Sequence, residues 1–169
     1  GAEMIRPWLA TLLLPMLLCS MPSLASEAGL STEAERSGFA RTGRYAEVGE
    51  LAAAFQARWP DRVAVRSFGT TPEGRPMHVL VVPATGAFEP EEARRRNLPV
   101  VLVQGGIHAG ESDGKDAGFL ALRDVLEGKA APGALDRLVW LFVPVFNVDG
   151  HERFGRWNRP NQRGPEEMG

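Results

Sequence analysis

The chain has 169 residues, of which 44% are hydrophobic and 24% charged. This composition is typical of a globular protein, and the length leaves room for one ordinary domain. A net charge of −2 and a sequence pI of about 6.0 provide no cationic field that would attract nucleic acid. We therefore expect no nucleic-acid partner.

The first 25 residues have the pattern of a secretory signal peptide, with extra residues upstream of Met4. An apolar stretch runs from Trp8 to Cys19, and Ser23-Leu24-Ala25 then offers small residues at the positions that a signal peptidase reads. The stretch is too short to cross a bilayer as a helix, and Pro15 interrupts it, so no permanent membrane anchor is expected. The pattern predicts a secreted or periplasmic protein.

Cleavage after Ala25 would remove Cys19, which is the only cysteine of the chain. The mature chain would then have neither disulfides nor thiolate ligands. Any metal ion would have to be held by His, Glu and Asp side chains.

Residues 26–43 are small, polar and aperiodic, and this pattern predicts a linker, with order beginning near Tyr45. Apolar residues at helical spacing, from Val48 to Trp59, predict an amphipathic helix over residues 45–59 that packs on a sheet.

Two segments rich in β-branched residues, 63–68 and 77–82, flank a loop of glycines and prolines at 69–76. This arrangement predicts a β-hairpin with a long loop. Residues 83–98 carry acidic residues and three consecutive arginines, and we interpret them as a solvated face or a short exposed helix.

A strand at 100–104, a helix at 113–127 ended by Gly128, and an apolar strand at 138–145 follow in that order. The succession predicts a βαβ unit whose two parallel strands are buried on both faces, and therefore an α/β fold. Both strands would release the loops at their carboxyl ends on one edge of the sheet.

One of these loops contains an imidazole and a carboxylate at close spacing, His108 and Glu111, within Gln104–Glu111. If both side chains face the same side of a tight turn, they can hold a zinc ion together. The alternative is a helix-capping Glu111 beside a His108 that is only hydrogen-bonded. The preceding buried strand, the flexible glycines and the following helix favour the metal site.

The second loop, Asn147–Gly150, predicts an Asx turn with Gly150 at positive φ. The cationic stretch Arg156–Arg159 lies a few residues beyond it, and fixed cationic donors near a zinc would suit an anionic intermediate or a substrate carboxylate. Exposed loop arginines are the equally common alternative. His78 is expected to pack in the core or face solvent from a strand, whereas His151 is the one in-chain candidate for a third metal ligand.

Together these motifs resemble the zinc carboxypeptidases of the M14 peptidase family. The resemblance covers about residues 44–169 and rests on the lead-in helix, Gly74-Arg75-Pro76, Gly106–Glu111 and Pro144–Gly150. It implies a three-layer α/β/α fold around a mixed, partly parallel sheet. It also implies hydrolysis of a peptide bond at or near the free carboxyl terminus of a peptide or protein substrate.

The resemblance further implies a Zn²⁺ cofactor and the roles of several residues. His108 and Glu111 match the first two metal ligands of the family. Arg156 matches the arginine that polarises the scissile carbonyl, and it is grouped with Asn158 and Arg159 as substrate-binding residues. The family's third ligand, its Asn-Arg pair for the terminal carboxylate and its general-base glutamate would lie beyond residue 169, so we expect a truncated domain that is inactive alone and binds zinc weakly.

Two departures leave the substrate preference open, because Gly110 stands where pancreatic-type enzymes have arginine and Val148 replaces the usual proline. Two other functions also stay open. One is a zinc amidohydrolase resembling the aspartoacylase and succinylglutamate desuccinylase branch. The other is a secreted module without catalytic activity that binds peptides or cell wall.

Overall fold

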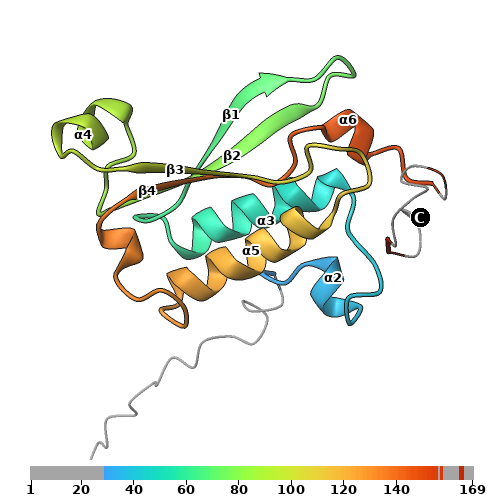
Figure 1. Cartoon of the computed structure of the whole chain (residues 1–169), viewed down its shortest axis with the longest axis horizontal. Helices are drawn as coiled ribbons and strands as arrows, with labels where there is room; N and C mark the ends of the chain where they lie inside the picture. The colour runs from blue at the N-terminus through green and yellow to red at the C-terminus, as the bar shows by residue number, and fades with distance from the viewer. Residues whose placement is uncertain (1–28, 156, 158–163, 166–169) are drawn as a thin grey trace, which may run out of the picture.

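A computed structural model describes residues 29–155, 157, 164 and 165 (Figure 1). The predicted signal peptide over residues 1–25 lies outside the described residues. Within the described part of the chain, no helix is long and apolar enough to cross a membrane.

The described residues form a mixed sheet of four strands in the order β1-β2-β4-β3. β1 and β2 form an antiparallel hairpin, β2 pairs antiparallel with β4, and β3 pairs parallel with β4. The predicted hairpin and the predicted parallel pair are therefore confirmed. The strands are β1 (Ala64–Thr70), β2 (Pro76–Pro83), β3 (Val100–Gln104) and β4 (Val139–Val143).

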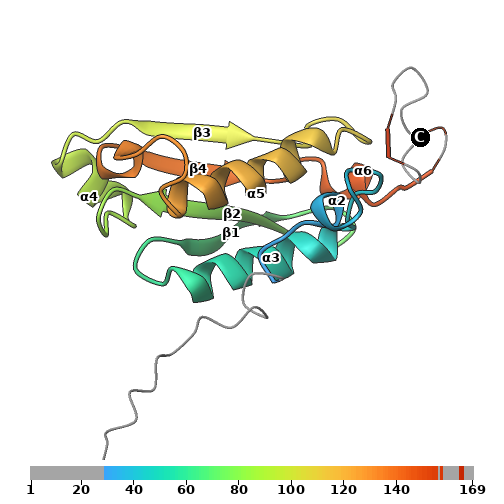
Figure 2. The same ribbon diagram turned by 90° about the horizontal axis from the view of Figure 1, so that it is seen from below.

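Two long helices, α3 (Tyr45–Arg58) and α5 (Asp113–Leu126), lie side by side against one face of this sheet (Figures 1 and 2). Both helices were predicted, and Gly128 at φ +74° ends α5 as expected. The described part of the chain thus has the predicted α/β class with an open, mixed sheet. The shorter helices are α2 (Glu33–Arg36), α4 (Pro90–Arg95), the 3₁₀ helix η1 (Ala134–Asp136) and α6 (Val148–His151).

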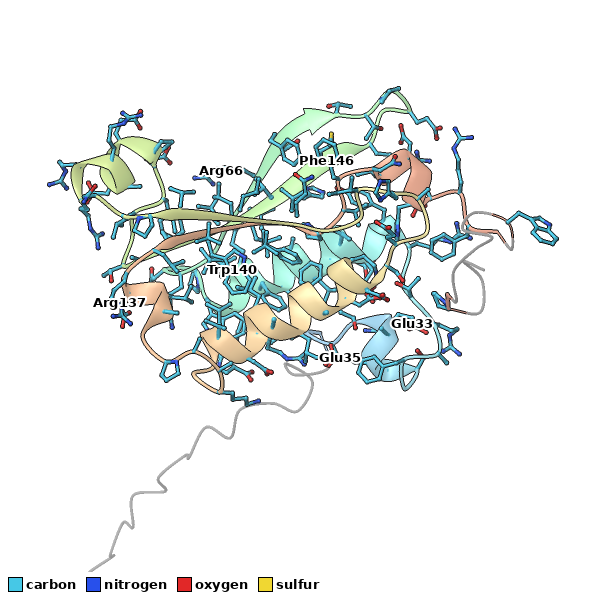
Figure 3. All side chains as sticks on the ribbon, in the orientation of Figure 1. Glu33, Glu35, Arg66, Arg137, Trp140 and Phe146 are labelled. Atoms are coloured by element: carbon cyan, nitrogen blue, oxygen red, sulfur yellow. The ribbon has the colours of Figure 1, made fainter. Side chains whose placement is uncertain are left out.

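The core fills the space between these two helices and the sheet. The Phe119 ring of α5 meets the Phe55 ring of α3 and the Phe142 ring of β4 edge to face, at centroid distances of 5.5 and 5.2 Å. Trp140 of β4 also points to the helical side (Figure 3). Alternating residues of β2 and β4 therefore supply one apolar wall, as a half-covered sheet requires.

The expectation that both parallel strands are buried on both faces is wrong for β3. Val100 and Leu102 are 55% and 58% exposed. In the described part of the chain β3 pairs only with β4, and α3 and α5 cover only the face of the sheet opposite to the Val100 and Leu102 side chains. An apolar strand sequence cannot distinguish an edge strand from a central one, because the covering layer comes from elsewhere in the chain.

Order begins earlier than Tyr45, so that expectation is also wrong. α2 occupies part of the predicted linker, where Thr32 and Glu35 form a reciprocal capping box at its start. Arg123 of α5 donates to the Leu30 carbonyl (2.8 Å) and forms an ion pair with Glu35. Leu30 is buried, and long-range contacts fix a segment whose own sequence shows no periodicity.

Alanine substitutions at two glycines inside helices are expected to change the stability of the fold in opposite directions. A Cβ at Gly118 would lie 2.3 Å from the Phe142 ring, whereas a Cβ at Gly49 would make an ordinary 3.7 Å contact with His78. We expect Gly118→Ala to destabilise the fold by about 1–3 kcal/mol through overpacking. Gly49→Ala should stabilise it by up to about 1 kcal/mol through helix propensity. Chemical denaturation of both variants checks the pair, and a stabilised Gly118→Ala would contradict the packing of α5 on β4.

Candidate functional site

Backbone hydrogen bonds join the loops that leave β3 and β4 at the same edge of the sheet. The N–H of Gly105 donates to the Val143 carbonyl (2.9 Å), and the N–H of Phe146 returns a bond to the Gly105 carbonyl (3.0 Å). The N–H of Asn147 then donates to the Gly106 carbonyl (2.8 Å). The parallel ladder thus continues past both strands, and the two loops that carry the predicted chemistry lie side by side.

Gly105 is required at this junction because there is no room for a side chain. A Cβ there would lie 2.6 Å from the Pro144 carbonyl oxygen and 2.9 Å from the carbonyl carbon of Gly114 in α5. The next residue, Gly106, adopts φ +55°, a conformation that favours glycine. The first turn of α5 therefore packs directly on the loop, which fixes where the residues between them point.

The structure brings His108 and Glu111 together. Nδ1 of His108 and Oε2 of Glu111 are 3.0 Å apart, and the Glu111 N–H donates to the His108 carbonyl (3.2 Å) across a tight turn. Gly110 adopts φ +81° within this turn. The two side chains are 64% and 35% exposed, so the pair is open to solvent.

The separation of these two atoms suits a shared metal ion. Two ligand atoms about 2.0–2.1 Å from a tetrahedral zinc lie about 3.3 Å from each other. The observed 3.0 Å between Nδ1 and Oε2 needs only a small side-chain adjustment to reach that geometry. The same distance also makes a good hydrogen bond, so the alternative of a hydrogen-bonded His108 has the same geometry.

A third metal ligand does not come from the described residues. No group of three or more His, Cys, Asp or Glu side chains suited to a metal occurs within residues 29–155, 157, 164 and 165. The three residues predicted to bind substrate, Arg156, Asn158 and Arg159, lie outside the described part of the chain.

The two other histidines, His151 and His78, pack within the fold. His151 is 2% exposed, and its Nε2–H donates to the Gly43 carbonyl (3.2 Å), so the ring is buried and tied to the segment before α3. Burial, reinforced by the Lys115 ammonium, lowers the pKa of His151 to about 4. His78 of β2 stacks on Tyr45 at a centroid distance of 5.9 Å, and burial lowers its pKa.

The predicted Asx turn is present, since the Asn147 side-chain oxygen accepts from the Gly150 N–H (3.1 Å). The predicted positive φ of Gly150 is wrong, because the turn opens a short helix, α6, and Gly150 lies inside it.

Asp149 of α6 accepts from Thr71 Oγ1 (2.8 Å) and pairs with Arg75 (2.5 Å) in the β1–β2 loop. Burial alone would raise the pKa of Asp149, but these partners lower it. The carboxylate therefore ties the hairpin loop to α6.

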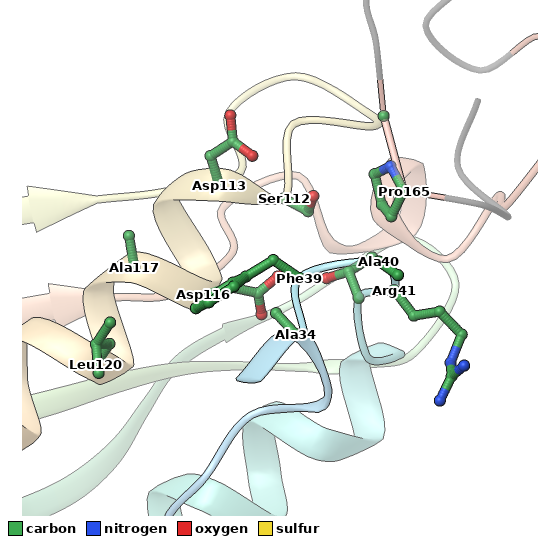
Figure 4. Close-up of a pocket in the computed structure, with 12 residues that line it drawn as sticks. Ala34, Phe39, Ala40, Arg41, Ser112, Asp113, Asp116, Ala117, Leu120 and Pro165 are labelled. Atoms are coloured by element: carbon green, nitrogen blue, oxygen red, sulfur yellow. Dashed lines mark hydrogen bonds between the residues drawn. The ribbon is translucent and has the colours of Figure 1, made fainter. Parts of the chain in front are cut away.

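Two hollows flank the loops. One of about 380 Å³ includes Ile107, Phe146 and Met77 in its lining, beside the His108 turn. Another of about 580 Å³ lies between α5 and residues 39–42, with Asp113, Asp116 and Arg41 in its lining (Figure 4). Neither His108 nor Glu111 lines either hollow, and within the described part of the chain the pair lies at a surface turn, with the side chains 64% and 35% exposed.

Sequence reasoning missed a buried polar cluster below these loops. Lys115 is 1% exposed, and its Nζ lies 2.7 Å from Asp116 Oδ1 and 3.3 Å from Glu47 Oε2. It also donates to the Gly43 carbonyl (3.2 Å). A signal existed, because Lys115 occupies the buried stripe that continues through Phe119, Leu122 and Leu126 of α5.

Comparison with known proteins places the chain in a family. The model of the M14 peptidases, described as zinc carboxypeptidase, matches residues 48–167. The chain belongs to this family. It is 31% identical over 114 residues to a carboxypeptidase B of Helicoverpa zea, and 35% identical over 89 residues to an inactive metallocarboxypeptidase, ecm14, of Schizosaccharomyces pombe. These matches cover 64% and 50% of this chain, respectively.

The chain spans about a quarter or less of the length of these two relatives, namely 25% of the first and 18% of the second. The fold agrees with the family, since the crystal structure of a carboxypeptidase A from Helicoverpa armigera is similar with a TM-score of 0.55. That match has 21% sequence identity and covers 75% of this chain and 31% of the other.

The pKa of His151 predicts how the stability of this family member depends on pH. The folded-state pKa of about 4 lies below the ordinary 6.5, so the unfolded chain takes up the proton first as the pH falls. Stability should therefore be lost from about pH 6.5 downwards, by about 2 kcal/mol at pH 4.5. His151→Phe keeps a ring in place and should lack this component. The difference between wild type and variant in denaturation at pH 7 and pH 4.5 measures it, and identical pH dependence would contradict a buried neutral His151.

Proposed function

We propose that this chain is part of a zinc-dependent metallocarboxypeptidase that hydrolyses peptide bonds at or near a free carboxyl terminus. One observation supports the proposal above the others. In a chain of the zinc carboxypeptidase family, an exposed imidazole nitrogen and carboxylate oxygen lie 3.0 Å apart at the carboxyl end of a parallel strand. This is the edge at which open α/β sheets bind their ligands.

His108 through Nδ1 and Glu111 through its carboxylate would supply two of the protein ligands. Bound there, zinc would lower the pKa of a water molecule and polarise the substrate carbonyl. Nδ1 of His108 is the ring nitrogen that lies beside Glu111, and it would have to present its lone pair rather than a proton to bind the ion. Arg156 would hold the scissile carbonyl oxygen through its guanidinium, with Asn158 and Arg159 beside it for the substrate.

The isolated chain is proposed to bind zinc weakly and to lack peptidase turnover. Among the described residues no third His, Cys, Asp or Glu joins His108 and Glu111 at the candidate site, whereas catalytic zinc has three protein ligands. The predicted amino-terminal signal supports export of the parent protein to the periplasm or the cell exterior. The family match favours the peptidase over the amidohydrolase reading.

A second candidate is a non-catalytic binding module within the same family. The similarity to a relative named an inactive metallocarboxypeptidase, at 35% identity, favours this alternative. Zinc binding at His108 and Glu111, together with turnover by the parent protein, would separate the two.

Zinc titration of the 169-residue chain, followed by ¹H–¹³C spectra of its histidine rings, tests the proposed ligands. We expect the His108 signal to shift saturably, because its ring is exposed and beside Glu111, while the signals of buried His151 and stacked His78 stay in place. Glu111→Gln should weaken binding by about 10- to 100-fold, since it removes the charged partner.

Glu89→Gln is the matched control, because it neutralises an exposed glutamate that pairs with Arg66 of β1 and directly precedes α4, at the amino end of β3 rather than at its carboxyl end. It should leave the His108 titration unchanged. A wild-type His108 signal that ignores zinc would overturn the ligand assignment, and peptidase turnover by the isolated chain would overturn the proposed incompleteness.

A further inference from the structure

The buried Lys115 has no part in the chemistry proposed above. Its side chain is 1% exposed and lies in the first turn of α5, among Glu47, Asp116 and the Gly43 carbonyl. Asp116 in turn accepts from Thr42 Oγ1 (2.6 Å). The cluster thus joins the start of α5 to the segment that leads into α3.

Burying the Lys115 ammonium at the amino end of α5 is expected to contribute little net stability to the fold. A cation at the amino end of a helix opposes the helix dipole. Burying an ion pair removes both charges from water, and apolar residues of the same size are often equally stabilising. Burial also raises the pKa of Asp116 against the opposing effect of the Lys115 ammonium, which shows the desolvation that the cluster tolerates. A role in positioning explains such a group better than a contribution to overall stability.

The cluster contacts the loop that follows β4 through α6. The Gly43 carbonyl accepts from both Lys115 Nζ and His151 Nε2, each at 3.2 Å, so one oxygen atom links α5 to α6. A second hydrogen bond joins the end of α6 to the start of α3, since Glu152 Oε1 accepts from the Tyr45 N–H (2.6 Å).

The loop that carries His108 and Glu111 is contacted through α5 itself. The N–H of Lys115 donates to the carbonyl of buried Ser112 (3.1 Å), which directly follows Glu111. The neighbouring Gly114 packs against Gly105 at the start of the loop. Displacement of the first turn of α5 would therefore move both ends of the segment that carries His108 and Glu111.

We propose that Lys115 is a positioning residue that holds the His108–Glu111 turn and α6 in one fixed arrangement. Lys115 acts through the Gly43 carbonyl and the first turn of α5, and it touches neither candidate ligand in the contacts described. The metal-related part of this inference rests on the proposed function, whereas the positioning itself does not.

Native-state amide hydrogen exchange tests the positioning without metal. Lys115→Met keeps the length of the side chain and removes its charge. We expect exchange of the Glu111, Asn147 and His151 amides to accelerate by about tenfold, while amides at the centre of the β2–β4 pairing keep their wild-type rates. A role confined to overall stability would change the most protected amides as well. Uniform acceleration, or no local change, overturns the inference.

The zinc titration adds a second readout. We expect the dissociation constant at His108 to rise by about tenfold in Lys115→Met. Lys129→Met, which removes an exposed lysine just after the other end of α5, should change neither exchange nor zinc binding. If Lys115→Met does not fold, Asp116→Asn removes the carboxylate 2.7 Å from the ammonium and carries the same two readouts.

The outcomes separate this inference from the proposed function. A wild-type chain that binds zinc at His108, with Lys115→Met binding equally well and exchanging as wild type, overturns the positioning role alone. A wild-type chain that ignores zinc, while Lys115→Met shows the local acceleration, overturns the ligand assignment and supports the positioning role.

Discussion

The arrangement of the candidate site depends on a short run of backbone hydrogen bonds beyond the ends of β3 and β4. Gly105 and Gly106 exchange bonds with Val143, Phe146 and Asn147, and so extend the parallel ladder into the loops. Because Gly105 has no side chain, the chain passes between the Pro144 carbonyl and α5. The short His108–Glu111 turn and the Asn147 turn inherit their positions from this junction.

Features with a local cause could be predicted from the sequence. The repeat of apolar residues every three or four positions identified α3, the position between two strands and the terminating Gly128 identified α5, and apolar, β-branched runs identified the strands. The prediction that His108 and Glu111 meet also rested on local information, since a tight turn brings residues three apart together. Their 3.0 Å contact confirms the proximity, whereas the metal itself stays a prediction.

Features that depend on distant partners could not be predicted. α2 is held by Arg123, which is 88 residues away from Glu35, and no periodicity in residues 26–43 could show this. The exposure of Leu102 depends on what covers the edge of the sheet, not on the strand itself. Lys115 is an intermediate case, because a lysine in a buried stripe is visible in the sequence, although its partners on Gly43 and Glu47 are not.

Gly118 has a consequence for how this fold tolerates sequence change. The absent Cβ leaves room for the Phe142 ring, which would otherwise be met at 2.3 Å, and so α5 rests close to the sheet. The two positions share a single volume of space. A homologue that acquires a methyl group on the helix should compensate with a smaller residue on the strand, so the pair is expected to covary in evolution even though neither residue takes part in chemistry.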